Sequence, residues 1–86
     1  IYALPARYEP FGLSVLEAAL AGCALVLGDI ASLRENWDGA ACFVDPGDPA
    51  ALRAALEALV ATPERRLELG EKARARALAL ARPEQM

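Results

Sequence analysis

The sequence predicts an α/β protein that contains part of a doubly wound parallel sheet. Its apolar runs are short and continuous rather than alternating, which is typical of parallel strands buried on both faces. Segments with helical periodicity and helix-start signals separate these runs. The resulting order of strand, helix, strand, helix, strand, helix and helix is the order that consecutive βα units of such a sheet produce.

The first part of the chain supplies two strands and the helix between them. Residues 1–5 (IYALP) form a short apolar run that a proline ends. After a loop, residues 12–21 are rich in Ala and Leu, and Gly22 follows them as a typical helix end. Residues 23–28 (CALVLG) then form a second apolar run of strand length. We therefore expect a strand–helix–strand unit here.

The middle of the chain predicts a short helix and a third strand. Ser32 and Glu35 have the spacing of a capping box, which predicts a helix over residues 33–37. We expect Trp37, at the end of that helix, to pack into the core rather than to stack on a ligand. Residues 40–44 (AACFV) are the third apolar run. Three strands make a thin sheet with open edges.

Two helices close the chain. Asp48 and Pro49 are typical of a helix start, and apolar residues then recur at helical spacing as far as Val60. Thr62 repeats the start signal, and the last helix is expected to run to about Arg82.

Composition narrows the classes of function. The 86 residues are 56% hydrophobic and 24% charged, as in a globular segment, and the net charge is −3. This charge argues against nucleic-acid binding, which needs a dense basic face. The two cysteines, Cys23 and Cys42, lie in apolar runs, so we expect buried free thiols, and with no histidine we expect no metal site. We therefore expect a cytoplasmic location, and a full-length protein that contains this chain could lie at a membrane surface. The apolar residues at the start of the chain suggest that it is a fragment.

Two acidic residues, Glu9 and Glu17, stand in the otherwise apolar stretch EPFGLSVLEAALAGCALVLG. In an open parallel sheet, ligands bind beyond the carboxyl ends of the strands, and this stretch follows the first of those ends. A helix that starts near Leu13 would turn its first N–H groups toward that edge and attract a phosphate, and Gly12 would let the ligand approach closely.

A carboxylate such as Glu17 inside a buried helix would need hydrogen-bond donors, because burying it unpaired costs several kcal/mol. Sugar hydroxyls supply such donors. The pattern therefore favours a ligand with both phosphate and polyol character, such as a nucleotide sugar. The alternative is that Glu17 pairs with an arginine and that Glu9 is a solvated loop residue. Asp29, at the end of the second strand, could line the cleft but is expected to be structural, as is Glu35.

The chain also resembles the C-terminal, donor-binding domain of retaining glycosyltransferases of family 4, which have the GT-B fold. Glu9 and Glu17, with seven residues between them, match the E-x7-E motif of that family. The segments EPFGL, LEA, GDI and VDPGDPAAL follow in the expected order. The resemblance covers residues 1–82 and leaves residues 83–86 as a tail. It implies the C-terminal, Rossmann-like part of a nucleotide-sugar-binding domain.

This resemblance implies roles for individual residues. Glu9 would contact hydroxyls of the donor sugar and is the catalytic candidate, and Glu17 would hold the ribose hydroxyls. The sugar and the distal phosphate would be held by Phe11, Gly12, Leu13 and Ser14. The implied reaction transfers a sugar from a nucleotide sugar to an acceptor hydroxyl with retention of configuration. The nucleotide sugar is then a substrate, and neither a cofactor nor a metal ion is implied.

The chain also departs from the family pattern. The basic residues that usually hold the diphosphate, the base-binding loop and the acceptor domain come upstream in the family and are missing here. The chain alone is therefore expected to be inactive, with its sugar, glycan or lipid-linked acceptor bound by the missing N-terminal domain. Two alternatives remain open. One is a GT-B relative such as a sugar-nucleotide epimerase or a phosphorylase. The other is a non-catalytic α/β module that binds a partner or forms a homodimer through its open sheet edges.

Overall fold

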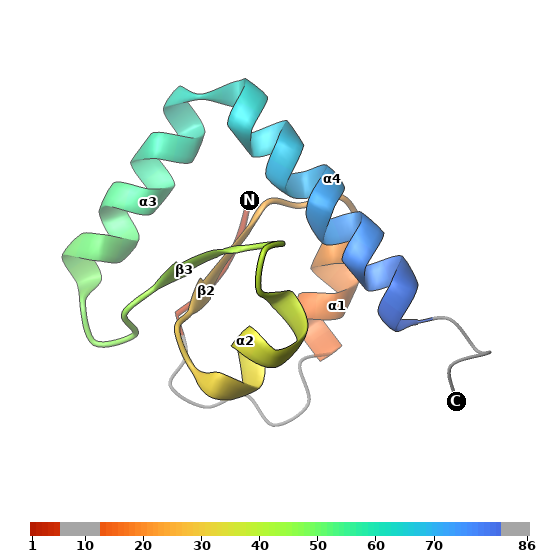
Figure 1. Cartoon of the computed structure of the whole chain (residues 1–86). Coiled ribbons are helices and arrows are strands. Elements are labelled where there is room, and N and C mark those ends of the chain that lie inside the picture. Colours follow the sequence, from red (N-terminus) through yellow and green to blue (C-terminus); the bar gives the residue numbers. More distant parts are fainter. Residues whose placement is uncertain (6–12, 82–86) are drawn as a thin grey trace.

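The computed structural model describes residues 1–5 and 13–81, and its elements follow the predicted order (Figure 1). The α/β fold with a parallel sheet is confirmed. The elements are β1 (Tyr2–Leu4), α1 (Leu13–Leu20), β2 (Leu25–Gly28), α2 (Ala31–Trp37), β3 (Cys42–Val44), α3 (Pro49–Ala61) and α4 (Pro63–Leu80).

The three strands form one parallel sheet in the order β1, β2, β3. Ala3 of β1 lies beside Val26 of β2, and Leu27 lies beside Phe43 of β3. The backbone N–H of Tyr2 donates to the carbonyl of Ala24 at 2.9 Å, so the backbone groups of Ala3 point away from β2. Within the described residues no strand pairs with this outer edge of β1.

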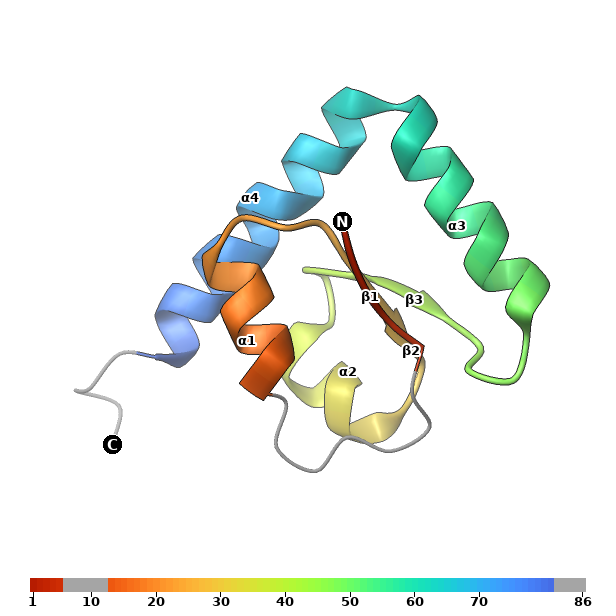
Figure 2. The ribbon, with the colours of Figure 1, turned by 180° about the vertical axis from the view of Figure 1, so that it is seen from behind.

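Helices cover both faces of the sheet. Leu25 and Leu27 of β2 belong to a buried cluster with residues of α1, α2 and α4, whereas Val26 belongs to a second cluster with α3. These positions alternate because successive strand residues point to opposite faces. Both views show α3 on one side of the sheet and α1 and α2 on the other (Figures 1 and 2).

Helix α4 joins the two layers. Its Leu69 packs in the cluster beneath α3, and Ala73 and Ala77 pack in the cluster beneath α1 and α2. Between them, Gly70 lies against the turn that leads from α1 into β2. A Cβ atom at Gly70 would overlap the carbonyl oxygen of Gly22 and would lie 3.3 Å from its carbonyl carbon. Helix α4 therefore packs against the turn at the amino end of β2.

Helix α1 ends at a glycine turn, as the sequence predicts. Gly22 has φ +85°, a conformation that glycine adopts without the steric penalty of a side chain. The N–H of Gly22 donates to the carbonyl of Ala19, and the N–H of Cys23 donates to the carbonyl of Ala18. This pair of hydrogen bonds is a Schellman motif, which satisfies the last carbonyls of the helix.

The starts of α3 and α2 differ in how well the sequence predicts them. The carboxylate of Asp48 accepts hydrogen bonds from the N–H groups of Ala50 and Ala51, as expected of an N-cap. The capping box in α2 is wrong, because that helix begins at Ala31 with Ile30 as its cap and has no side-chain cap bond. Ser32 therefore lies inside the first turn, where its hydroxyl cannot play the capping role.

Other expectations are confirmed or corrected by the side chains. Trp37 is buried in the core, as predicted. Cys23 and Cys42 are free thiols, but both are half-buried rather than fully buried. Among the helices of the described ranges, none combines the length and the apolar character needed to span a bilayer.

Candidate functional site

The carboxyl edge of the sheet gathers the starts of the helices. Each of α1, α2 and α3 begins after the carboxyl end of the strand that precedes it, so the positive ends of three helix dipoles lie along this edge. The start of α3 is occupied by the chain itself, because the Asp48 carboxylate accepts from two of its first amides. The starts of α1 and α2 lack an acidic residue in their first turn.

Three of the six predicted site residues belong to the described part of the chain. Leu13 and Ser14 form the beginning of α1, and Glu17 lies one turn further along it. The other three, which are the catalytic candidate Glu9, Phe11 and Gly12, lie outside the described residues. Their roles stay predictions.

The position of Glu17 corrects the idea of a buried carboxylate. Val15 and Ala19 carry the buried face of α1, whereas Glu17 points to the exposed face. Leu13, four residues earlier on the same face, is 62% exposed. The apolar neighbours of Glu17 in the sequence thus lie on the opposite side of the helix. The structure brings Glu17 close to the start of α1 along one surface, where a ligand can reach both.

A side-chain hydrogen bond joins β1 to the first turn of α1. The phenolic hydroxyl of Tyr2 donates to Oγ of Ser14 at 2.8 Å. The body of Tyr2 packs against the core beneath α1. This contact fixes the second residue of α1 to the sheet. The role of Tyr2 could not be predicted from the sequence, because a tyrosine in a short apolar strand gives no signal of which group its hydroxyl contacts.

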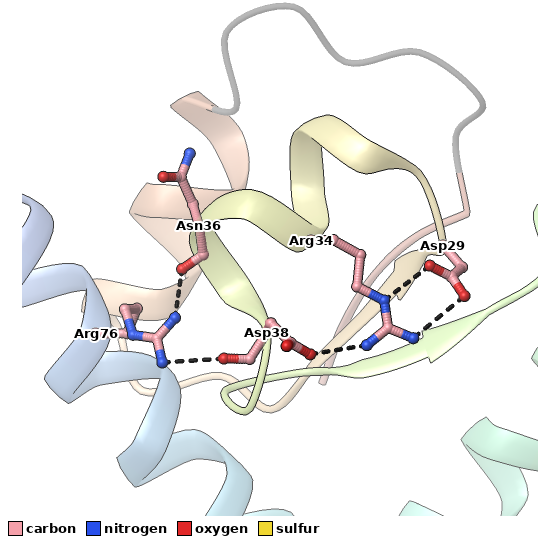
Figure 3. A network of polar contacts seen from close by, with 5 residues as sticks. All are labelled: Asp29, Arg34, Asn36, Asp38 and Arg76. Atoms are coloured by element: carbon pink, nitrogen blue, oxygen red, sulfur yellow. Dashed lines mark hydrogen bonds and ion pairs between the residues drawn. The ribbon is translucent and has the colours of Figure 1, made fainter.

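A second polar network lies on α2 (Figure 3). Arg34 donates to both carboxylate oxygens of Asp29, at 2.8 and 3.2 Å, and to Asp38 at 2.8 Å. Its Cζ atom lies 4.1 Å from the centroid of the Phe43 ring, within the range of a cation–π contact. Asp29 thus has the structural role expected of it, as the partner of an arginine that sequence analysis did not single out.

The network shifts the ionisation of its members. The hydrogen bonds from Arg34 lower the pKa of Asp29 below its ordinary value, and desolvation opposes this only in part. The hydrogen bonds to Asp29 and then to Asp38 raise the pKa of Arg34. With two carboxylates on one guanidinium, this cluster carries a net negative charge and is a poor place for an anionic ligand. The start of α1 is therefore the better anion site of the two.

Arg76 of α4 completes the support of α2 (Figure 3). Its guanidinium donates to the backbone carbonyl of Asn36 at 2.6 Å and to that of Asp38 at 3.0 Å. These carbonyls lie at the end of α2, where a cation compensates the negative end of the helix dipole. Arg34 and Arg76 together hold α2 along its length. The contacts span 38 and 40 residues of sequence, so no local pattern could have revealed them.

Comparisons with known proteins agree on one family. The family described as glycosyl transferases group 1 matches residues 1–76. Glycogen synthase from two strains of Mycobacterium tuberculosis, CDC 1551 / Oshkosh and H37Rv, is 44% identical over 64 residues, which cover 70% of this chain and 15% of the synthase.

Among solved structures, sucrose-phosphate synthase from Thermosynechococcus elongatus superposes with a TM-score of 0.84 at 30% identity. The match covers 96% of this chain and 21% of that protein. The chain thus spans less than a quarter of the length of each of these relatives.

Proposed function

The chain belongs to the group 1 glycosyl transferases, and on that premise we propose that it is the donor-side segment of an enzyme that uses a nucleotide sugar. The reaction would transfer the sugar to an acceptor hydroxyl with retention of configuration. The comparisons support sugar transfer by a GT-B enzyme. The donor, the stereochemistry and the site residues are our proposal.

The observation that carries this proposal is the exposed carboxylate of Glu17 on the surface that leads from the start of α1. A carboxylate has two acceptor oxygens and can hold two vicinal hydroxyls at once. The ribose of a nucleotide offers such a pair. The helix start one turn away offers backbone N–H groups to the attached phosphates.

The remaining roles follow from the same arrangement. We propose that Glu9 contacts the hydroxyls of the transferred sugar as the catalytic residue. The amides of Phe11, Gly12 and Leu13, with Ser14, would hold the sugar and the distal phosphate. Amide donors at a helix start can stabilise the leaving diphosphate without a metal ion. Because the match covers a small part of each relative, the acceptor would bind to another part of a longer enzyme, and this chain alone would be inactive.

The experiment that tests this proposal is ligand-detected NMR of the chain with UDP-, GDP- and ADP-sugars. Glu17→Gln is the test variant, and Glu35→Gln is its matched control. Glu35 holds the same fifth position in α2 that Glu17 holds in α1, and both side chains are exposed. We expect binding that Glu17→Gln weakens about tenfold, the loss typical of a charge-assisted hydrogen bond, and that Glu35→Gln leaves unchanged.

Equal losses in both variants would contradict a specific role for Glu17. If none of the three nucleotide sugars binds to the unmodified chain, the proposal that this segment holds the donor by itself is wrong.

A further inference from the structure

We propose that Tyr2 is a positioning residue that sets the first turn of α1, and the hydroxyl of Ser14, for the diphosphate of the donor. This inference rests on the proposed function, because the diphosphate belongs to the nucleotide sugar. Tyr2 itself would not touch the ligand. Its contribution would pass through the 2.8 Å hydrogen bond to Ser14.

Tyr2 is held firmly enough to play this part. Its backbone N–H donates to the carbonyl of Ala24 at 2.9 Å, which places the residue in the sheet beside β2. Its side chain packs against the buried cluster that contains Val15 and Ala19 of α1. Both ends of the tyrosine are therefore fixed, and the hydroxyl reaches Ser14 from a rigid base.

The two residues lie on either side of the predicted donor loop. Tyr2 belongs to the strand that precedes residues 6–12, and Ser14 belongs to the helix that follows them. Their hydrogen bond therefore closes a ring of chain that contains Glu9, Phe11 and Gly12. A contact of this kind limits how far the start of α1 can move relative to the sheet, which matters because phosphate binding needs the amides in one place.

The direction of the bond has a chemical consequence. The phenol of Tyr2 is the more acidic of the two hydroxyls and hence the better donor; when it donates, Oγ of Ser14 accepts through a lone pair and keeps its own proton for another acceptor. A hydroxyl that accepts a hydrogen bond also becomes a stronger donor. At the second residue of α1, the strongest acceptor that a nucleotide sugar can bring is a phosphate oxygen. Tyr2 would thus both orient the Ser14 hydroxyl and strengthen it.

The chain contains its own comparison for Ser14. Ser32 occupies the second position of α2, as Ser14 does in α1, and it is likewise exposed. α2 has no side-chain cap hydrogen bond, and in the described ranges Ser32 has no tyrosine partner. Removing the two hydroxyls in turn therefore separates the effect of the Tyr2 contact from the general effect of a serine in a first turn.

The test measures the affinity of the chain for inorganic pyrophosphate and for UDP-glucose by NMR titration, with Tm recorded for every variant. We expect Tyr2→Phe and Ser14→Ala each to weaken pyrophosphate binding about three- to tenfold, the range for one hydrogen bond. The double variant should bind no more weakly than Ser14→Ala alone, because both changes remove one pathway. Ser32→Ala should bind as the unmodified chain does.

The outcomes distinguish this inference from the function on which it rests. If UDP-glucose binding depends on Glu17 but Tyr2→Phe leaves pyrophosphate affinity unchanged, Tyr2 does not position the site and the proposed function stands. If the losses of Tyr2→Phe and Ser14→Ala add, the two hydroxyls act separately and the inference is wrong. A Tyr2→Phe variant that only lowers Tm shows a structural contact alone. If neither probe binds the unmodified chain, both proposals fail.

Discussion

Replacing Gly70 by alanine should destabilise the protein although alanine is the better helix former. At a solvent-exposed position in the interior of a helix, replacing glycine by alanine stabilises the fold by about 1 kcal/mol. Here the new Cβ would overlap the carbonyl oxygen of Gly22 and lie 3.3 Å from its carbonyl carbon. The obstacle is backbone in a Schellman turn, with Gly22 at φ +85°, and no flexible side chain can move away.

The expected size of the effect follows from these two opposing contributions. Overpacking a close contact costs about 1–3 kcal/mol, and a clash with fixed backbone belongs at the upper end of that range. After subtracting the gain in helix propensity of about 1 kcal/mol, the net loss is about 2 kcal/mol. For a domain of this length, such a loss lowers Tm by about 8–16 °C.

The assay is thermal and urea unfolding followed by circular dichroism. Glu71→Ala, at the next and exposed position of α4, is the control and should change the free energy of unfolding by less than about 0.5 kcal/mol. A Gly70→Ala variant as stable as the unmodified chain, or more stable, would refute the reasoning. Such a result would mean that α4 does not pack closely against the turn after α1.

Two further predictions concern the polar network on α2. Arg76→Gln removes the cation from the carbonyls at the end of that helix and should lower the free energy of unfolding by about 1–2 kcal/mol. The control is Arg74→Gln at an exposed position of α4, which should change that free energy little. Equal effects of the two substitutions would contradict the role of Arg76. The lowered pKa of Asp29 means that its pair with Arg34 stabilises the fold above the ordinary pKa of about 3.9 and that this stability is lost as pH falls through the lower folded-state pKa. The difference in Tm between the unmodified chain and Asp29→Asn should therefore shrink from about pH 5 toward pH 2, and a difference that stays constant over that range would count against the pair.

The sequence predicted the elements well because local chemistry determines their order. Gly22 and Asp48 made the end of α1 and the start of α3 predictable, since each acts within a few residues of its own position. The capping box failed for a related reason. Ser32 and Glu35 have the right spacing, but Ile30, which has an extended conformation, is the N-cap, so α2 starts two residues earlier than predicted. A spacing pattern cannot show which residue leaves the helical conformation.

The candidate site was predicted only in part. The position of Glu17 after the first strand pointed to the carboxyl edge, and in the structure Glu17 lies on the exposed face of α1, one turn from the start of that helix. Its surroundings were misjudged, because apolar neighbours in sequence do not show which face of a helix they occupy. Tyr2 and Arg76 act through contacts across 12 and about 40 residues of chain, and such contacts depend on packing that no local pattern describes.

The packing of helix α4 also has a consequence for how the protein unfolds. Its buried residues are divided between the two faces of the sheet, with Leu69 on one and Ala73 and Ala77 on the other. Detaching this helix would therefore expose apolar side chains on both faces of the sheet at once. The described part of the chain should therefore behave as a single cooperative unit, in which the amides of β2 and those of α4 exchange with solvent through the same opening. The surface beside Glu17 would then depend for its rigidity on α4, which packs directly against the buried face of α1.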